Sequence, residues 1–291
     1  MIVLLRYGAY PVILMACLTG NLVLFHMGTG ELLATYLPVT LGTVLIMALE
    51  ATLPYRSDWR PSRVEVVQDS TFLALVHVIL PKVLAAASVF VMFDVLNGRG
   101  WIIASWWPHD WPVPVQAVLM VLIVDGLRYW LHRISHEWEP LWRFHAVHHA
   151  PNRLYTLNVG RFHPIDKGLQ FVLDALPFLA LGVREDVLSL YFVWYAVNGF
   201  FQHSNADVRL GWLNYAVSGP ELHRWHHAVQ KEESNHNYGN HLIVWDVVFG
   251  SRYLPADRSV GALGLVNRQY PRGFLNQMAA PFTPGLDKRT V

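Results

Sequence analysis

Two long stretches without a charged side chain limit the fold more than any other feature of this sequence. Residues 7–30 contain no Asp, Glu, Lys or Arg, and neither do residues 32–49. A helix that crosses a bilayer needs roughly 20 mostly apolar residues. Both stretches are therefore predicted to be transmembrane helices, joined by a short turn at 28–31. Because only Arg6 precedes the first, without a small-residue cleavage site, we expect a retained helix and not a signal peptide.

Two further apolar stretches extend this pattern. Residues 70–96 are mostly apolar, but Pro81 and Lys82 interrupt them, which predicts a kinked helix or a pair of half-spans. The next stretch begins near Pro112 and continues past Asp125 without a helix breaker, so this helix should leave the bilayer and extend into water. Only 15% of the residues are charged, against about 25% in soluble domains. The sequence therefore predicts an all-α integral membrane protein with four transmembrane helices.

A further apolar hairpin is expected after these four helices. Its two arms are residues 168–182 and 187–204, joined by a charged turn at 183–186. Asp174 and Pro177 weaken the first arm, so the arms can be two further crossings or a shallow re-entrant hairpin. Either arrangement returns the chain to the side of the membrane that it left.

The distribution of arginine predicts the orientation in the membrane. The loop at 54–69 holds three arginines, whereas the turn at 28–31 has no positive charge. Cytoplasmic loops carry an excess of Lys and Arg, so the arginine-rich loop is assigned to the cytoplasm. The N-terminus and the region that follows the fourth helix then lie on the same side. An aromatic belt is expected at the opposite interface, formed by Trp101, Trp106, Trp107 and Trp111.

The chain is expected to form a single membrane domain, 1–291, because no repeat, linker or low-complexity tract divides it. We divide it into transmembrane helices at 1–131, a histidine-rich catalytic region at 132–252 and a polar C-terminal tail at 253–291. A net charge of +1 without a basic stripe gives no case for nucleic acid as a partner. The single Cys17 offers no disulfide and no cysteine metal site, so any metal chemistry must depend on the 15 histidines.

Histidine is concentrated in three short motifs, HRISH, HAVHH and HRWHH. Residues three or four apart share one face of a helix, so each motif turns its imidazoles toward one point. Several buried rings that point the same way all need polar partners, and a bound metal supplies them at once. Eight histidines exceed the three or four ligands of a single zinc, so two metal ions are implied. The motif histidines are His132, His136, His145, His148, His149, His223, His226 and His227. Elsewhere, His26, His77 and His109 are expected to be satisfied core or interface residues.

The ordered motifs resemble the histidine boxes of the fatty acid hydroxylase / sterol desaturase superfamily, whose members are membrane oxygenases with a non-haem di-iron centre facing the cytoplasm. Further similarity lies in RFHPID at 161–166, in FQHSN at 201–205 and in NHNYGNHLIVWDVVFGS at 235–251. The resemblance covers about 120–252 and implies His203 as a ninth metal ligand.

One position departs from the pattern of this superfamily. Its fatty acid 2-hydroxylases carry another histidine four residues before the one that matches His203, and this chain has Gly199 there. Either the ligand set is smaller, or His236 or His241 completes it, or this chain belongs to a different subgroup.

Several polar residues near the motifs are expected to support the ligands from behind, as outer hydrogen-bond partners do at metal sites. Asp125 lies seven residues before His132 on the same helical face and can hold a ring N–H, although a salt bridge with Arg128 is equally plausible. His163 precedes Pro164 and can be a ligand, an outer partner or a helix-start residue; we favour the outer partner. The full set of outer partners is Asp125, His163, Asp166, Asn237 and Asp246, with Glu137 and Asn235 as further candidates.

The resemblance implies a membrane-bound, O2-dependent di-iron oxygenase that hydroxylates or desaturates a C–H bond of a lipid, such as a sterol or fatty acyl chain. It would use two iron ions, O2 and an external electron donor. Because the chain has no cytochrome domain, iron–sulfur cysteine motif or GxGxxG, the donor is expected to be a redox partner protein or a small reductant.

Three other functions compete with this hypothesis. The form HRxxHE at 132–137 is also similar to the alkylglycerol monooxygenase branch, which uses tetrahydrobiopterin and acts on ether lipids. Outside enzymes, the alternative is a histidine-rich membrane metal transporter or metal-binding protein. Transporters tend to place ionisable ligands at mid-bilayer, whereas these motifs follow the helix ends. A zinc hydrolase would need a positioned carboxylate base and would work without O2.

Overall fold

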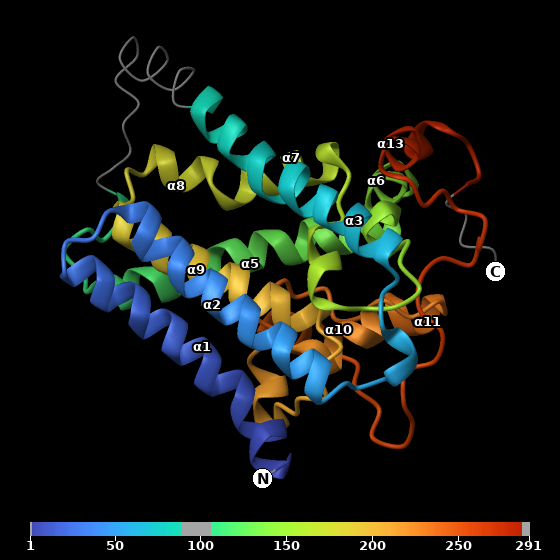
Figure 1. Ribbon diagram of the computed structural model, residues 1–291. Helices are drawn as coiled ribbons and strands as arrows, with labels where there is room; N and C mark the ends of the chain where they lie inside the picture. The colour runs from blue at the N-terminus through green and yellow to red at the C-terminus, as the bar shows by residue number, and fades with distance from the viewer. Residues whose placement is uncertain (1, 89–105, 287–291) are drawn as a thin grey trace.

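The computed structural model describes residues 2–88 and 106–286 (Figure 1). Within these two ranges the regular structure is helical and no β-strand forms, which confirms the predicted all-α class. Four of the described helices are long and apolar enough to cross a membrane. They are α1 (Ile2–His26), α2 (Glu31–Thr52), the continuous helix Arg63–Ser88 and α5 (Val113–Glu137).

The centre of the membrane part is a packed group of three helices. α1 and α2 lie side by side, and α9 (Glu185–His203) packs against both of them (Figure 1). Gly42 permits this approach, since a Cβ atom at this position would lie 2.7 Å from the Sγ atom of Cys17. Large apolar side chains on the outer faces, such as Val12 and Leu41, are exposed. This arrangement suits helices that are surrounded by lipid.

The third long helix begins earlier than predicted because of a capping box. The Oγ atom of Ser62 accepts from the backbone N–H of Glu65, whose carboxylate accepts from the backbone N–H of Ser62. From there α3 (Arg63–Phe72) leads directly into a π-helical segment, η2 (Leu73–Ile79).

The predicted interruption at Pro81 takes the form of this π-helical segment. Proline lacks a backbone N–H, and its ring clashes with the carbonyl one turn earlier in an ordinary α-helix. A wider turn directly before it avoids both problems while the helix continues to Ser88. Residues 89–96 of the predicted stretch lie outside the described residues, as does Trp101 of the predicted aromatic belt.

The predicted apolar hairpin contains three helices, and its first arm does not form a full crossing. The first arm divides into α7 (Pro164–Asp174) and α8 (Leu176–Ala180), and α7 has only 11 residues, too few for a crossing. The break follows Asp174, whose carboxylate binds the guanidinium of Arg128 on α5 at 2.6 Å. The second arm forms α9.

Two tryptophans of the expected aromatic belt, Trp106 and Trp111, are exposed, but the prediction is wrong for Trp107. Only 4% of Trp107 is exposed, and its Nε1 atom donates to the side chain of Gln116 at 2.6 Å. Its ring packs against Phe178 of α8. Trp107 therefore anchors the start of α5 inside the protein.

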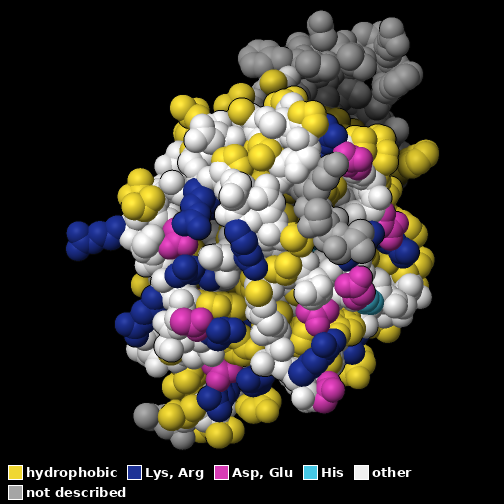
Figure 2. Space-filling model, turned by 90° about the vertical axis from the view of Figure 1, so that its right-hand side faces the viewer, with side chains coloured by type: hydrophobic (Ala, Val, Ile, Leu, Met, Phe, Trp, Pro, Cys, Tyr) yellow, Lys and Arg dark blue, Asp and Glu magenta, His cyan; other side chains and the backbone are white. Residues whose placement is uncertain are grey.

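The histidine region occupies one end of the molecule. In Figure 1 the α1–α2 turn and the start of α9 lie at the left, and α6 (Glu139–His149) and α13 (Phe274–Ala279) lie at the right. The arginine-rich loop is joined to the histidine end, because the backbone N–H of Tyr55 donates to the carbonyl of Asn205 at 2.6 Å. Seen end-on, this side of the molecule carries many charged side chains (Figure 2). Its remaining short helices are η1 (Ser57–Trp59), η4 (Thr156–Gly160), η5 (Gly211–Tyr215), α10 (Pro220–His226), α11 (Lys231–Ser234), α12 (Val244–Phe249) and η6 (Ala280–Phe282).

The segment after residue 252 is packed against the histidine region and is not a free polar tail. Leu263 and Leu265 are buried, and Tyr270 belongs to a hydrophobic cluster with Trp142 of α6. The side chain of Gln277 lies 3.4 Å from Arg161. The C-terminal segment therefore covers one side of the candidate site.

Candidate metal centre

All nine histidines that the sequence singled out lie in two compact groups. Within each group, one ring nitrogen from every histidine lies within 4.8 Å of those of the others. The five-histidine group consists of His132, His136, His145, His149 and His226. The four-histidine group consists of His148, His203, His223 and His227.

A break between two helices brings the first two motifs together. α5 carries HRISH in its last turns and ends at Glu137. The next residue, Trp138, has an extended backbone (φ −111°, ψ 114°) that separates α5 from α6. α6 then starts at Glu139, and Pro140 fits in its first turn, where no intrahelical N–H is needed. As a result, the Nε2 atoms of His132 on α5 and His145 on α6 lie 3.0 Å apart.

Hydrogen bonds behind the five-histidine group determine which ring nitrogen faces its centre. The Nδ1 atom of His132 lies 2.8 Å from the carbonyl oxygen of Tyr238, and that of His145 lies 2.9 Å from the carboxylate of Asp166. A carbonyl or carboxylate can only accept, so both Nδ1 atoms carry the proton. Both Nε2 atoms then present lone pairs to each other at 3.0 Å, and a cation between them removes the repulsion. The residues therefore fit a metal ion.

The four-histidine group has the same chemistry with fewer supports. The Nδ1 atom of His203 donates to the Oδ1 atom of Asn158 at 2.9 Å, and that of His148 donates to the carbonyl of Arg161 at 3.2 Å. The Nε2 atom of His223 lies 3.0 Å from that of His203 and 3.0 Å from that of His227. The Nδ1 atoms of His223 and His227 have no hydrogen-bond partner among the described residues.

Burial keeps these imidazoles in the neutral form that binds metal. It lowers the pKa of His223 to about 3, with nearby imidazoles contributing to the same shift. It also lowers the pKa values of His148, His149, His226 and His227 well below the ordinary value. Neutral rings with free lone pairs are available at physiological pH, so metal binding does not have to displace protons from them.

The two groups lie next to each other. His148 and His149 are consecutive but belong to different groups, as do His226 and His227. The rings of His149 and His227 stack across the boundary, with their centroids 4.4 Å apart. The sequence HH in two of the motifs therefore places two metal positions side by side.

Of the predicted outer partners, Asp166 contacts a histidine directly. Its second carboxylate oxygen accepts from the side chain of Gln170 at 3.1 Å, which holds the carboxylate in place for His145. Asn235, a further candidate, lies 3.3 Å from the Nδ1 atom of His136. Asp246 acts one step away, because it accepts from the backbone N–H groups of Tyr238 and Gly239 and fixes the carbonyl that binds His132.

The prediction that Asp125 holds the ring N–H of a ligand histidine is wrong, and so is its alternative, a salt bridge with Arg128. The Oδ2 atom of Asp125 accepts from the backbone N–H groups of His241 and Leu242, and Arg128 pairs with Asp174. Helical periodicity identified the face of α5 that Asp125 occupies, but not that a distant loop lies against it.

Three more predicted roles need correction. The outer-partner role that we favoured for His163 is wrong, and its helix-start alternative is confirmed: it is the N-cap of α7, where its Nδ1 atom accepts from the backbone N–H of Ile165 at 3.1 Å. Asn237 fastens a loop through Leu222 and Tyr253, and its positive φ of 56° is an unusual conformation that asparagine tolerates. Glu137 pairs with Arg133 on the surface of α5.

The sequence did not reveal Asn158 as the support for His203. Its only signal was a polar residue between Leu157 and Val159. Three other ligand rings are held by backbone carbonyls, which no sequence pattern can reveal because every residue has one. These pairs are His148 with Arg161, His132 with Tyr238 and His226 with His236.

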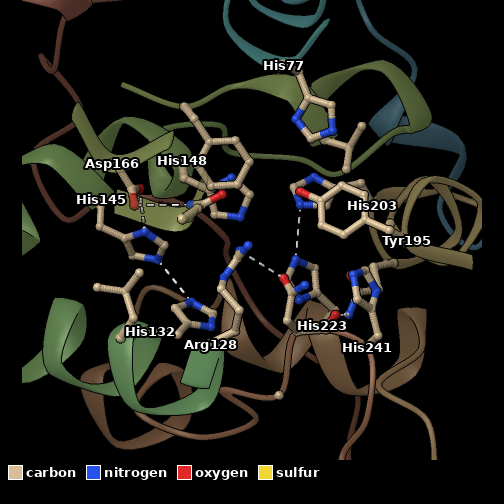
Figure 3. Close-up of a pocket in the computed structure, with 18 of the residues that line it drawn as sticks. His77, Arg128, His132, His145, His148, Asp166, Tyr195, His203, His223 and His241 are labelled. Carbon is tan, nitrogen blue, oxygen red and sulfur yellow. Dashed lines mark hydrogen bonds and ion pairs between the residues drawn. The ribbon is translucent and has the colours of Figure 1, made fainter. Parts of the chain in front are cut away.

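A cavity of about 50 Å³ borders both histidine groups (Figure 3). Its wall includes Gly199, where the fatty acid 2-hydroxylases carry a histidine. It also includes His241, which belongs to neither histidine group in the described part of the chain. His236 also lies outside both groups in the described part of the chain. His77 lines the cavity too, and its Nδ1 atom lacks a partner in the described ranges, so its prediction as a satisfied core residue is wrong.

Comparison with known proteins yields consistent relatives. Residues 117–251 match the family model described as fatty acid hydroxylase. Over 286 residues the chain is 36% identical to the ornithine lipid hydroxylase OlsE of Rhizobium tropici. The aligned region covers 94% of this chain and 83% of that protein.

Two further relatives match about half of the chain. The chain is 30% identical to the alkylglycerol monooxygenase of Danio rerio over 50% of this chain and 32% of that protein. It is 28% identical to the Delta(7)-sterol-C5(6)-desaturase of Nicotiana tabacum over 49% of this chain and 51% of that protein. No solved structure matches the chain. The long match to the bacterial hydroxylase shows that this chain, an oxidoreductase, belongs to the fatty acid hydroxylase / sterol desaturase superfamily.

Proposed function

We propose that this protein is an O2-dependent di-iron enzyme that hydroxylates a C–H bond of a membrane lipid, with an ornithine-containing lipid as the first candidate substrate. The observation that carries the proposal is the arrangement of nine histidines in two adjacent groups, within which Nε2 atoms of neighbouring rings lie 3.0 Å apart. The candidate substrate follows from the relative from Rhizobium tropici, to which most of the chain is similar.

The five-histidine group and the four-histidine group would each hold one iron ion. Imidazole is a suitable ligand for iron. Bound iron would supply the O2 activation that breaks an unactivated C–H bond, chemistry that no side chain can perform. The tasks of the chain itself are then to hold the imidazoles, to position the lipid and to exclude water.

The fold performs these tasks with its transmembrane helices. α5 crosses the apolar part of the molecule and carries His132 and His136 in its last turns. Its outer face exposes apolar side chains, including Leu122 and Ile123, so a lipid can lie along it with one end near the cavity. The cavity is small, about 50 Å³, which leaves room for few water molecules beside the reacting group.

We place the metal centre on the cytoplasmic side of the membrane, in a single membrane domain. The arginine-rich loop is hydrogen-bonded to the histidine end, where the carbonyl of Arg60 accepts from Arg153 at 2.9 Å. The N-terminal Arg6 pairs with Asp207 at the same end. Arginine-rich loops are retained in the cytoplasm, which supports this orientation. Electrons would arrive there from an external redox protein or a small reductant.

Membership of an oxidoreductase superfamily argues against the transporter hypothesis. The relatives named as a sterol desaturase and an alkylglycerol monooxygenase are similar to this chain over about half of its length. The relative named as a lipid hydroxylase is similar over nearly all of it. Hydroxylation is therefore the reaction that we favour.

Lipid mass spectrometry tests this proposal. Bacteria that contain ornithine lipid would express the wild type or His148→Ala, with growth under ¹⁸O₂ for the labelled sample. We expect a lipid that gains one labelled oxygen atom in the wild type, and none in the variant. His26→Ala, at an exposed end of α1, is the matched control and should retain full activity. An unlabelled or unchanged lipid profile in the wild type would refute the proposal.

A further inference from the structure

The wall of the cavity beside the two histidine groups includes two residues that each have an unsatisfied polar side-chain atom. His241 and Asn240 are neighbours on the loop before α12, and both line the cavity. His241 is labelled in Figure 3. The Nε2 atom of His241 and the Nδ2 atom of Asn240 are buried, and neither has a hydrogen-bond partner among residues 2–88 and 106–286. Unpaired buried polar groups are rare in folded proteins, so this pair calls for an explanation.

The hydrogen bonds around His241 make its Nε2 atom a donor. The Oδ1 atom of Asn198 accepts from the hydroxyl of Tyr10 at 2.6 Å, so the amide nitrogen of Asn198 faces the other way. That nitrogen lies 3.1 Å from the Nδ1 atom of His241 and donates to it. The ring proton of a neutral His241 must then be on Nε2, and only 2% of this residue is exposed.

Asn240 also presents a donor. Its Oδ1 atom accepts from the guanidinium of Arg128 at 3.1 Å, which leaves the amide Nδ2 group without a partner in the described chain. The backbone of this loop is fixed on both sides: the carbonyl of Asn240 accepts from Gln202 at 2.6 Å, and the backbone N–H of His241 donates to Asp125 at 3.2 Å. Two N–H donors are therefore held in place at the wall of one cavity.

We propose that the Nε2 group of His241 and the Nδ2 group of Asn240 bind a carbonyl or carboxylate oxygen of the lipid head group. The inference rests on the proposed function, because it names the part of the substrate that enters the cavity. Two N–H donors require an acceptor, and a carbonyl or carboxylate oxygen supplies one.

The size of the cavity agrees with this ligand. One water molecule needs about 10–15 Å³, so a cavity of about 50 Å³ holds roughly three to five water-sized groups. A carboxylate or amide group fits in that space, whereas a long acyl chain does not. The carbon that reacts would then lie close to the polar head of the lipid, and not near the end of a hydrocarbon chain.

Two substitutions remove these donors while keeping the bonds that support the fold. Asn240→Asp retains an oxygen for Arg128 but replaces the cavity donor with an acceptor. His241→Asn retains an atom at the position of Nδ1 for Asn198 and deletes the Nε2 group. Asn276→Asp makes the same chemical change as the first variant at an exposed position on α13, and serves as the matched control.

The test measures binding and turnover of ornithine lipid by the iron-loaded, full-length protein in nanodiscs. Binding is measured without O2, so that it does not depend on catalysis. We expect Asn240→Asp and His241→Asn to raise Kd and KM by about tenfold or more, and Asn276→Asp to change neither. An alkylglycerol, which has no carbonyl oxygen, should bind equally to the wild type and all variants. Iron content and melting temperature should stay at the wild-type values.

Each other result counts against the inference. An unchanged Kd in both variants would overturn it, as would loss of iron from both, which would assign these side chains to the support of the metal centre. Failure of the wild type to bind ornithine lipid would also overturn it. A wild type that binds ornithine lipid but never hydroxylates it would instead refute the proposed function while the binding site stands.

Discussion

The five-histidine group and the four-histidine group differ in how firmly their rings are held. In the five-histidine group, His132, His136, His145 and His226 each have an outer partner at the Nδ1 atom. In the four-histidine group, only His148 and His203 have such a partner in the described part of the chain, since the Nδ1 atoms of His223 and His227 lack one. Outer partners fix the orientation of a ligand ring and raise its basicity.

The difference indicates a division of roles. A group with more fixed rings is better prepared to bind a metal, whereas the four-histidine group has fewer ligands and looser support. Three of its members, His148, His203 and His223, line the cavity together with Gly199. Catalytic metal sites commonly leave a position open for substrate or oxygen. We therefore expect the four-histidine group to be the weaker and more accessible metal position.

The largest effect is expected from removing one ligand in either group. His136→Ala and His227→Ala should each lower lipid turnover by more than about a hundredfold, because even the loss of an outer partner can cost 10–100-fold. The rates are measured by lipid mass spectrometry at equal protein amounts. A variant of either group that keeps more than a tenth of the wild-type rate would show that its group is not needed for the reaction.

Outer partners should affect only their own group, by about 10–100-fold in metal affinity. Asn158→Leu removes the acceptor behind His203, and Asp166→Leu removes the one behind His145. Competition with a chelator should show two phases of metal release, with Asn158→Leu accelerating the earlier phase and Asp166→Leu the later one. Asn158→Asp keeps an acceptor and should restore most of the affinity. A single phase of metal release from the wild type would contradict the claim that the two histidine groups hold their metal ions with different strength.

A histidine at Gly199 should make the two groups more alike. Gly199→His places an imidazole one helical turn before His203 on α9, and we expect about tenfold slower metal release from the four-histidine group. Turnover should fall because the new ring occupies part of the cavity. Gly199→Ala is the control, since its Cβ atom would lie at an ordinary contact distance of 3.5 Å from Val159. Faster metal release from Gly199→His would contradict the claim that the four-histidine group has an open ligand position beside Gly199.

The smallest effect is expected at Glu137, which adjoins the five-histidine group but faces outward. It pairs with Arg133 one turn earlier, at 2.9 Å, and about half of its side chain is exposed. Glu137→Gln should therefore reduce the free energy of unfolding by no more than about 0.5 kcal/mol, as for other exposed helical pairs. Chemical denaturation measures this change. A loss of metal affinity in this variant would show that Glu137 does support a ligand.

The sequence was most informative where the signal is local. The spacing of HRISH predicted that His132 and His136 come together, because a helix fixes the relation of residues three and four apart. The long apolar stretches predicted the candidate membrane helices for the same reason. The expectation that each motif turns its histidines toward one point is wrong for HAVHH and HRWHH, whose histidines divide between the two groups.

The sequence was least informative where the contact is distant in the chain. Asp174 ends α7 by binding Arg128, 46 residues earlier, which no local pattern on the first arm of the hairpin could reveal. Asp125 binds backbone N–H groups more than 100 residues later. His77 faces the cavity from a π-helical turn, and an isolated histidine in an apolar stretch gives no indication of that position.

The central claim is that two histidine groups each hold one iron ion, and the iron content of the purified protein tests it most directly. Elemental analysis should find two irons per chain in the wild type and one per chain in both His136→Ala and His227→Ala. Chelation should remove the remaining iron faster from His136→Ala, which retains the four-histidine group. A wild-type protein, purified anaerobically and supplied with iron, that binds one iron or none per chain would contradict the claim.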